Sequence, residues 1–382
     1  MTSFAQFSRW TRQLLFAGSL MLGCGNPIPL PSEESGCVSP SCAEDSPQEP
    51  SVQEPERICP EGKDGDAYWR LPTGELGELA EDCTAEQLCL GGLCAKLGTF
   101  AFVSDKNGEA EIYLQEGFLA PLQITSTLPG VSPQSPDFCP ENVLLFELMQ
   151  GYFSELYLID SSGSVNRVTS APGYNHDPSC DTAGEWVYFS SNMSGTYNLY
   201  KIKPAEGPQS LTRLTHLPEI GDEGLIAVLE PDVCMVGDWV VLRCDYKDGE
   251  SENSEICKVG TDGTDFTRLT HSEHEGDHAP ACSPDGTKIA FASSRYDADL
   301  EQGNEDIYVI SIDGNNEQRI TREAAPELIP AFSSDGKLIG YKKYVERNGN
   351  YFTDLWITDV NGKEQMQLTS DPGNEYDITW KP

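Results

Sequence analysis

The stretch His278-Ala-Pro-Ala-Cys-Ser-Pro-Asp-Gly286 opens the best-preserved copy of a pattern that fills most of this chain. The copy continues with Lys288-Ile-Ala-Phe-Ala-Ser293, Asp306-Ile-Tyr-Val-Ile-Ser-Ile-Asp-Gly314 and Arg319-Ile-Thr321. Short runs of β-branched and aromatic residues alternate with turn residues, which is typical of short β-strands. A recurrence every 20 to 50 residues or so indicates an array of similar supersecondary units.

Six copies can be placed in register because each ends in an aliphatic residue followed by threonine. These threonines lie 44 to 55 residues apart: Thr125, Thr169, Thr215, Thr270, Thr321 and Thr369. Each copy also holds an acidic or amide residue before an aliphatic one, at Glu111, Glu155, Asn198, Glu255, Asp306 and Asp354. About 48 residues per copy suits the four short strands of a propeller blade.

Four copies carry a turn pair after the third expected strand: Ser162-Gly163, Asp262-Gly263, Asp313-Gly314 and Asn361-Gly362. Such pairs predict tight hairpins in which both residues adopt positive φ. No helical period longer than about ten residues appears after Lys96, so we expect an all-β domain.

The two ends of the repeat region complement each other. Asp377-Ile-Thr-Trp-Lys-Pro382 matches the opening strand of a copy and then stops, whereas the first copy, from Gly98, lacks that strand. If the C-terminal strand completes the first sheet, no sheet edge remains open. We therefore predict a six-bladed β-propeller over residues 97–382, closed by its N- and C-terminal strands.

The pattern Pro-x-aromatic-Ser-Pro-Asp-Gly, Ile-Ala-Phe, Asp-Ile-Tyr, Asp-Gly, Leu-Thr resembles the WD40-like (PD40) repeat of TolB-type six-bladed propellers. The resemblance covers about residues 97–382 and is clearest over 272–321. TolB-type propellers contact peptidoglycan-associated lipoprotein and dock translocating peptides, so the resemblance implies a protein or peptide partner. A cysteine-rich module stands here in place of their N-terminal α/β domain, so only the binding mode is carried over.

Residues 1–23 have the pattern of a signal peptide. Arg9 and Arg12 precede an apolar run at residues 14–22 that is too short to span a bilayer. The run ends in Met21-Leu-Gly-Cys24, which resembles a bacterial lipobox and implies lipidation of Cys24. We expect an outer membrane lipoprotein facing the periplasm or the cell surface, held to the membrane only by its lipid anchor. Ordinary secretion with a cut elsewhere is the alternative.

Two segments are expected between the lipidated cysteine and the propeller. Residues 24–57 are rich in Pro, Ser and Glu and predict a disordered tether. Residues 58–96 predict a small cysteine-rich module, since about forty residues cannot bury an adequate core unaided. We expect two disulfides there, among Cys59, Cys83, Cys89 and Cys94. A zinc site is the rival interpretation.

The six cysteines of the repeat region also predict disulfides. Cys244 and Cys257 fall on consecutive expected strands of one blade. The others fall on opening strands of neighbouring blades, which predicts the pairs Cys139 with Cys180 and Cys234 with Cys282.

The chain is strongly acidic, with a formal net charge of −37. No basic patch is available to neutralise phosphates, so nucleic acid is excluded as an expected partner. We expect a monomer that binds an envelope protein or peptide.

The candidate site lies at the mouth of the expected central channel, on the loops that lead into each innermost strand. These loops concentrate acid and histidine, at His176, Asp177, Asp222, Glu223, Glu275, Asp277, His278 and Glu327. We interpret them as partner-binding residues. A purely structural channel lining is an alternative interpretation, and a Ca²⁺ or other divalent cation at the mouth stays open although no cofactor is expected.

An enzyme is the alternative function. Some related propellers are metal-dependent lyases or hydrolases that act on acidic carbohydrate. The histidines here have no tight ligand spacing, and no Gly-x-Ser-x-Gly motif of an α/β-hydrolase occurs. No catalytic residue is therefore predicted, and the function expected is recognition.

Overall fold

The computed structural model describes residues 56–58, 67–70, 76–81, 83, 87–90, 92–170, 173–217, 224–234, 236–248, 251–272, 276–297 and 302–382. The expected signal peptide, lipidation site Cys24, tether and Cys59 lie outside these residues, as do Asp222, Glu223 and Glu275. The described part is almost wholly β, with two short 3-10 helices at Pro140–Asn142 and Gly207–Ser210. Within it, no helix has the length and apolar character needed to cross a bilayer.

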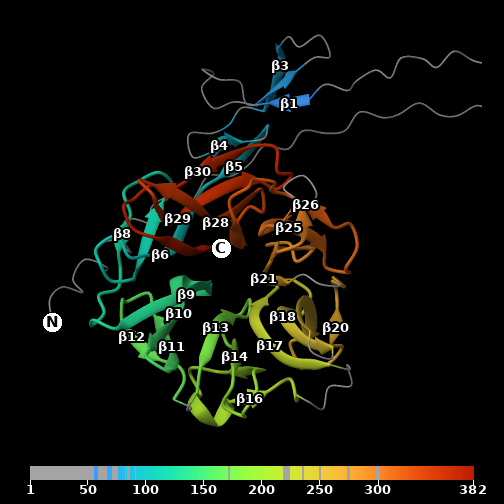
Figure 1. The fold of residues 1–382 in the computed structure, drawn as a ribbon. Coiled ribbons are helices and arrows are strands. Elements are labelled where there is room, and N and C mark those ends of the chain that lie inside the picture. Colours follow the sequence, from blue (N-terminus) through green and yellow to red (C-terminus); the bar gives the residue numbers. More distant parts are fainter. Residues whose placement is uncertain are drawn as a thin grey trace, which may run out of the picture.

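Six four-stranded antiparallel sheets surround a central axis, as Figure 1 shows. Blade 1 consists of β31 (Glu375–Trp380), β6 (Thr99–Ser104), β7 (Glu111–Glu116) and β8 (Leu122–Gln123). Blade 2 consists of β9 (Val131–Cys139), β10 (Val143–Gln150), β11 (Phe153–Ile159) and β12 (Val165–Arg167). Blade 3 consists of β13 (Asn175–Cys180), β14 (Val187–Ser191), β15 (Asn198–Ile202) and β16 (Thr212–Arg213).

The other three blades follow the same order from the axis outward. Blade 4 consists of β17 (Leu225–Val233), β18 (Trp239–Asp248), β19 (Ser251–Gly260) and β20 (Thr267–Arg268). Blade 5 consists of β21 (Asp277–Cys282), β22 (Lys288–Ser293), β25 (Asp306–Ser311) and β26 (Gln318–Arg319), with a small ribbon, β23 (Tyr296–Asp297) and β24 (Gln302–Gly303). Blade 6 consists of β27 (Glu327–Phe332), β28 (Leu338–Arg347), β29 (Asn350–Asp359) and β30 (Gln365–Gln367).

Blade 1 is built from both ends of the repeat region, which confirms the predicted closure. The C-terminal strand β31 pairs antiparallel with β6, with Glu375 opposite Ser104 and Trp380 opposite Phe100. The indole N–H of Trp380 donates to the carbonyl of Leu97 at 2.7 Å. The sheet that would have an open inner edge is thereby completed.

The recurring threonine has the same role in all six blades. Its hydroxyl oxygen accepts the N–H of the residue that follows the recurring acid or amide. In blades 1, 2 and 4 the same hydroxyl also donates to the carboxylate itself, at Glu111, Glu155 and Glu255. A single hydroxyl thus satisfies two polar groups inside each of these blades, which explains why this residue recurs.

The turn pairs differ from the prediction in one respect. Only the glycine of each pair has positive φ, for example 82° at Gly163 and 70° at Gly362, and the residue before it does not. Gly362 also packs on the carbonyl of Ile320 in the preceding blade, where a Cβ would overlap that oxygen. Gly263 and Gly314 pack in the same way on the carbonyls of Leu214 and Leu269, so these three glycines serve both turn geometry and close contact between blades.

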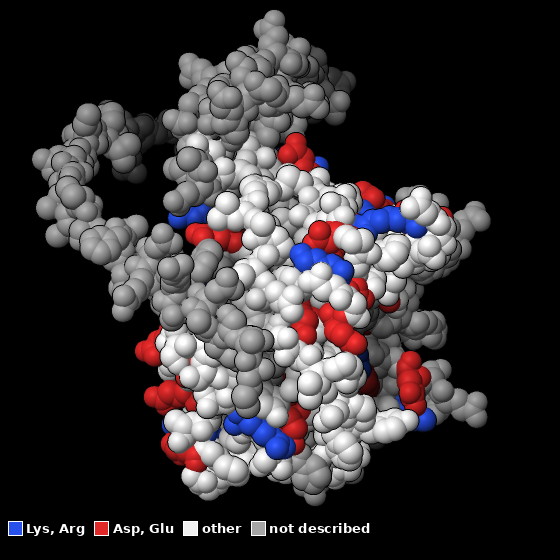
Figure 2. Space-filling view, turned by 90° about the vertical axis from the view of Figure 1, so that its left-hand side faces the viewer, with Lys and Arg blue, Asp and Glu red and all other residues white. Residues whose placement is uncertain are grey.

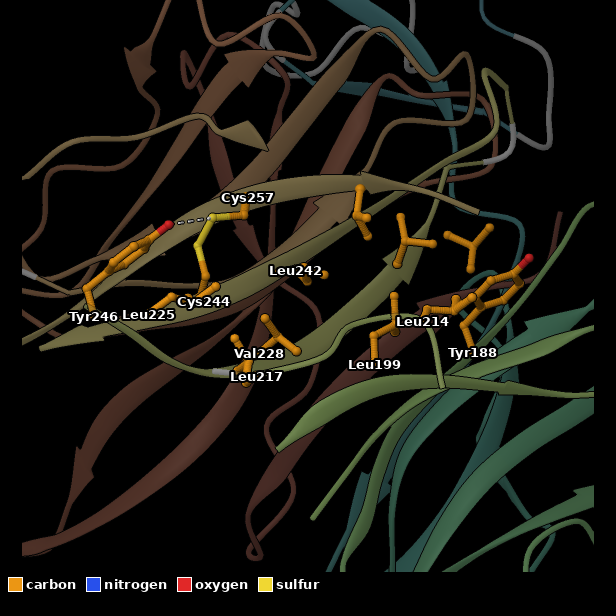
Figure 3. Close-up of a cluster of buried hydrophobic side chains, with 13 residues drawn as sticks. Tyr188, Leu199, Leu214, Leu217, Leu225, Val228, Leu242, Cys244, Tyr246 and Cys257 are labelled. Carbon is orange, nitrogen blue, oxygen red and sulfur yellow. Dashed lines mark hydrogen bonds between the residues drawn. A yellow bond between two sulfur atoms is a disulfide. The ribbon is translucent and has the colours of Figure 1, made fainter. Parts of the chain in front are cut away.

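The cores lie between blades. Figure 3 shows the cluster between blades 3 and 4, where Tyr188, Leu199 and Leu214 face Leu242. The Cys244–Cys257 disulfide joins β18 to β19 within this cluster and is fully buried.

The other disulfides of the propeller join innermost strands of neighbouring blades. Cys139 is bonded to Cys180 across blades 2 and 3, and Cys234 to Cys282 across blades 4 and 5. These are the pairs expected from the strand order.

The residues before the propeller form two further elements, drawn at the top of Figure 1. One is a three-stranded sheet of β1 (Glu56–Ile58), β2 (Ala67–Arg70) and β3 (Leu76–Glu81), and the other is a hairpin of β4 (Gln87–Leu90) and β5 (Leu93–Lys96). Cys83 is bonded to Cys94, and Cys89 also belongs to a disulfide. The hairpin packs on the propeller, since Lys337 donates to the carbonyl of Cys94 at 2.6 Å.

Candidate functional site

A central cavity of about 700 Å³ is lined by all six innermost strands, β9, β13, β17, β21, β27 and β31. Because the strands of different blades converge only at the axis, residues far apart in sequence meet here. The cavity is the expected site for a ligand of a ring-shaped fold.

Each innermost strand contains a bulge with one non-glycine residue whose φ is positive, at 46° to 54°, and β17 has a second irregularity near its start. A bulge interrupts the pairing of the strands and redirects a side chain, and here it can turn that side chain toward the cavity. The six bulge residues all line the cavity, and they are Ser135, Asp177, Glu230, Ala279, Ile329 and Asp377.

The ring of bulge residues is chemically two-sided. Asp377, Asp177 and Glu230, from blades 1, 3 and 4, supply carboxylates, whereas Ala279 and Ile329, from blades 5 and 6, supply apolar groups. An aliphatic cation is the kind of group that matches both sides, because its stem is apolar and its head is charged.

The carboxylates of the ring are held by the neighbouring blades. Asp377 accepts the backbone N–H of Ser135 at 3.0 Å, and the Ser135 hydroxyl donates to Asp177 at 2.9 Å. Glu230 accepts the N–H of Ala279 at 2.6 Å. These bonds fix the orientation of each carboxylate while leaving it partly exposed to the cavity.

A second pair of carboxyl groups lies two residues further along the strands. Asp232 accepts the N–H of Cys282 at 2.7 Å and the hydroxyl of Ser179 at 3.2 Å. Asp137 accepts the hydroxyl of Thr379 at 3.4 Å. Burial, together with the charge of Asp232, raises the pKa of Asp137 to about 7, and burial raises that of Asp232 to about 6.

The ring carboxyl groups show the same effect. Burial, followed by the charges of Glu147 and Glu230, raises the pKa of Asp177 to about 7. Burial also raises the pKa of Asp377. Burial thus favours the protonated form of these carboxyl groups, and a cation placed beside them would lower their pKa values again.

Two histidines flank the ring, each beside a glutamate. His176 Nδ1 lies 3.0 Å from Glu147, and its ring stacks on Tyr174. His278 Nε2 lies 2.9 Å from Glu305. Burial alone would lower both histidine pKa values, but the hydrogen bonds and charges of the glutamates raise them overall.

Positive charge near the ring lies outside the cavity lining. Arg243 pairs with Glu230 at 2.5 Å and with Asp245 at 2.9 Å. Of the described residues that line the cavity, none is lysine or arginine, whereas five are aspartate or glutamate.

No protein-family model matches the chain. Among curated proteins, an uncharacterised protein of Agrobacterium fabrum is 28% identical over 200 residues, half of this chain and 62% of that protein. The Tol-Pal system protein TolB of Desulfosudis oleivorans is 35% identical over 96 residues, a quarter of this chain and 19% of that protein. The chain thus matches less than two thirds of the length of either relative.

Solved structures resemble the described fold over more of the chain. TolB from Acinetobacter baumannii superposes with a TM-score of 0.60 at 22% identity, covering 75% of this chain and 67% of that one. A putative TolB from Agrobacterium tumefaciens gives 0.52 at 17% identity, covering 74% and 98%. In fold, this chain is a TolB-like six-bladed propeller. Oligogalacturonate lyase in complex with manganese gives 0.50 at 14% identity, covering 71% and 73%, a likeness of fold alone.

The TolB-like propeller brings only part of the predicted site to its cavity. Asp177 and His278 line it, and His176 lies beside them. Asp277 and Glu327, in contrast, are fully buried within their own blades, where Asp277 pairs with Arg295 and Glu327 with Lys343, each at 3.0 Å.

Four acidic residues that line the cavity were not among the predicted site residues: Asp137, Glu230, Asp232 and Asp377. Three of them adjoin the proline of an opening strand, as Pro136-Asp137 and Glu230-Pro-Asp232. In five blades of the TolB-like propeller the bulge residue directly precedes this proline. An acidic residue next to the recurring proline could therefore have been predicted to line the cavity.

The part of the chain that the structure describes contains no evident metal-binding site. There, no group of three or more His, Cys, Asp or Glu side chains converges as metal ligands. Three carboxyl groups of the cavity, those of Asp377, Glu230 and Asp232, instead accept backbone N–H groups of neighbouring blades.

Proposed function

We propose that this protein is a recognition module of the cell envelope, whose TolB-like propeller takes a basic segment of a protein or peptide partner into its central cavity. The proposal rests on the observation that, among the described residues, five carboxyl groups and no lysine or arginine line a cavity of about 700 Å³. Only Glu230 of these has an arginine partner, Arg243, so a lysine or arginine side chain of the partner would add positive charge beside the others.

The ring explains how such a side chain would be oriented. Its aliphatic stem would lie against Ile329 and Ala279, and its charged head would lie toward Asp177 and Glu230. Charge-assisted hydrogen bonds to carboxylates are short and strong. Because the attraction is electrostatic, affinity should fall as salt rises.

Acidic carbohydrate fits this cavity poorly. A uronate carboxylate would face Asp137, Asp177 and Asp232, and above about pH 7, where these three groups are ionised, like charges repel at close range. The likeness to oligogalacturonate lyase is one of fold at 14% identity, so recognition is the function we propose.

Envelope location is part of the proposal. It rests on the lipobox-like Met21-Leu-Gly-Cys24 and on the disulfides of the propeller, which persist in oxidising compartments. Metabolic labelling with a radioactive fatty acid should label the wild type, and Cys24→Ala should abolish the label. Label that persists in the variant would contradict anchoring at this residue.

Cavity binding is tested by calorimetry with hexalysine and hexaglutamate as probes. The wild type should bind hexalysine, more weakly as NaCl rises from 50 to roughly 300 mM, and should not bind hexaglutamate. Asp137→Asn with Asp177→Asn should weaken hexalysine binding tenfold or more. The control Glu185→Gln removes one charge from an exposed outer site and should change it less than twofold. Equal loss in the control would overturn the cavity as the site.

The partner itself is sought by photocrosslinking in cells. p-Benzoylphenylalanine at Ile329 places the reactive group against the cavity, and the same residue at Val165 places it on an exposed outer strand. A protein captured from position 329 and lost with Asp177→Asn would be the partner. Identical capture from both positions would contradict a cavity ligand.

A further inference from the structure

The central cavity has two tiers of side chains. The first tier is the ring of bulge residues, one from each blade. The second tier lies two residues further along each innermost strand and also lines the cavity. In the order of blades 1 to 6, its residues are Thr379, Asp137, Ser179, Asp232, Ala281 and Ala331.

Both tiers divide the blades in the same way. Blades 1 to 4 supply only acids and hydroxyls at each tier, and these residues form a polar wall. Blades 5 and 6 supply only alanine and isoleucine, and these residues form an apolar wall on the other side of the axis. A ligand that matches both walls is polar along one edge and apolar along the other.

The acids of the first tier have basic neighbours. Burial raises the pKa of Asp177 and of Asp377, and the charge of a basic side chain lowers it in each case. These neighbours are His176 for Asp177 and Lys342 for Asp377, while Glu230 pairs with Arg243. Three other acids around this tier, Glu147, Asp245 and Glu305, pair with His176, Arg243 and His278. Each of these six acids therefore has a basic group beside it.

The hydrogen-bond donors to the two acids of the second tier are, within the described residues, all uncharged. They are the N–H of Cys180 and the hydroxyls of Ser179 and Thr379 for Asp137, and the N–H groups of Val233 and Cys282 and the hydroxyl of Ser179 for Asp232. Neutral donors orient a carboxylate but do not cancel its charge. The second tier is therefore the part of the cavity where an added cation meets acids without basic neighbours.

One ammonium group can contact both acids of the second tier. Asp137 and Asp232 lie close together, since the hydroxyl of Ser179 interacts with both of them. A lysine ammonium has three donors, and its hydrogen bonds to carboxylates are about 2.8 Å long. The small side chains of Ala281 and Ala331 face the pair from the apolar wall and leave space for this group.

The outer surface of the molecule differs from the second tier. Figure 2 shows that basic side chains on one face lie beside acidic ones. Lys203 and Glu185 form an outer pair of this kind, at 3.0 Å. A basic ligand at such a place competes with a basic group of the protein, whereas at the second tier it does not.

The two tiers match the geometry of an extended peptide. In an extended chain, residues i and i+2 point to the same side, about 6.7 Å apart, and residue i+1 points to the opposite side. The tiers are also two residues apart along β-strands. Basic residues at i and i+2 can therefore reach the acids of both tiers, while residue i+1 faces the apolar wall at Ala279 and Ile329.

We propose that the partner segment lies extended along the cavity with two basic residues separated by one apolar residue, and that the second basic group binds between Asp137 and Asp232. This inference rests on the proposed function and deepens it. It names the sequence pattern of the partner and assigns a second cationic subsite below the bulge residues.

Two capped tetrapeptides of equal composition and charge test the pattern by calorimetry. Acetyl-Lys-Ala-Lys-Ala-amide has its lysines at i and i+2, whereas acetyl-Lys-Lys-Ala-Ala-amide has them at i and i+1. Only the first can place both ammonium groups on the polar wall and an alanine on the apolar wall. It should bind about tenfold more tightly than the second.

Asp137→Asn with Asp232→Asn removes the charges of the second tier alone. The variant should bind the alternating peptide no more tightly than the other, and binding of the other peptide should change by less than about twofold. The control Glu185→Gln, on the outer surface, should keep the full preference.

Ala281→Leu provides a second variant in case the double asparagine variant does not fold. It leaves both carboxyl groups and their hydrogen bonds in place and fills the second tier from the apolar wall. The preference for the alternating peptide should again be lost. Thermal unfolding checks that each variant is folded.

The outcomes separate this inference from the proposed function. Equal binding of the two tetrapeptides, or binding of neither, while hexalysine still binds would overturn the inference and leave the proposed function standing. A preference that survives in both variants would overturn the second subsite. Loss of hexalysine binding by the wild type as well would overturn both.

Discussion

The hydroxyl of Thr270 donates a hydrogen bond of 2.6 Å to the carboxylate of Glu255, inside blade 4. The same oxygen accepts the N–H of Ile256 at 2.9 Å, so one side chain satisfies a buried carboxylate and a buried backbone group. Arg268 completes the arrangement by pairing with Glu255 at 2.5 Å. The unit explains why an acid and a threonine recur at fixed places in the repeat.

Thr270→Val tests this unit. Valine keeps the shape but removes the hydroxyl, which leaves the buried N–H of Ile256 without its acceptor. Such a loss costs about 1–3 kcal/mol, so the free energy of unfolding in urea should fall by about that amount. Thr267→Val, on the exposed edge strand β20 of the same blade, should change it by less than about 0.5 kcal/mol. Equal effects would mean that the hydroxyl of Thr270 has no special role.

Gly362→Ala tests the contact between blades. Gly362 has a φ of 70° and packs on the carbonyl of Ile320, so alanine adds both backbone strain and a clash. Gly349→Ala is the matched control, because its φ is 78° and no atom lies within 4 Å of the added Cβ. The control should cost about 1–2 kcal/mol for backbone strain alone. Thermal unfolding should show a larger loss at Gly362, and similar losses would refute the steric role.

The fold was predictable because the same pattern of four strands recurs six times in the sequence. The strand order and the closure of blade 1 by residues 375–380 follow from matching the last opening strand to the first incomplete copy. The turn conformation was predicted less well, because positive φ was expected at both residues of Asp313-Gly314 and Asn361-Gly362. Local sequence does not show that the glycine must also accommodate a carbonyl from the neighbouring blade.

The candidate site was only partly predictable. Both Asp177 and Asp277 were assigned to the mouth, yet the bulge in each innermost strand gives them different surroundings. Asp277 sits two residues before the bulge residue Ala279 and is buried, whereas Asp177 is itself a bulge residue and faces the cavity. The bulge changes which side chains point toward the cavity. Its position depends on how the six innermost strands pack together, so a single strand sequence does not reveal it.

The free energy of unfolding should fall as pH rises through the neutral range. Unfolded aspartate titrates near pH 4, whereas Asp137 and Asp177 have pKa values of about 7. A carboxyl whose pKa is raised by folding contributes stability below about pH 4, and this contribution is lost as pH rises through about 7. The raised pKa values of His176 and His278 act in the same direction.

Urea unfolding between pH 4.5 and 8 measures this dependence. Asp137→Asn with Asp177→Asn removes two of the titrating groups, so its curve should be flatter than that of the wild type. Each proton accounts for at most about 1.4 kcal/mol per pH unit. A variant whose pH dependence equals that of the wild type would contradict the raised pKa values.

The disulfides between blades should hold the inner strands of the oxidised protein together. Mass spectrometry of non-reduced peptides should find Cys139 joined to Cys180 and Cys234 joined to Cys282. Cys139→Ser with Cys180→Ser opens a link across 41 residues and should lower the free energy of unfolding by about 2–4 kcal/mol. Finding Cys282 as a free thiol in the protein purified without reductant would refute the pairing.

The ring itself is tested at its closing strand. Deleting Tyr376 to Pro382 removes most of β31, exposes the inner edge of β6 and leaves Phe100 and Leu97 without the indole of Trp380. Because each core is shared by two blades, the loss should spread to blade 6, where Trp380 packs on Gly340. Trp380→Ala alone should lower the free energy of unfolding by about 3–5 kcal/mol.

The truncated protein should lose its cooperative thermal transition, whereas a protein that lacks only Pro382 should keep it. A truncated form that melts with the same midpoint and enthalpy as the intact protein would show that the blades do not depend on ring closure.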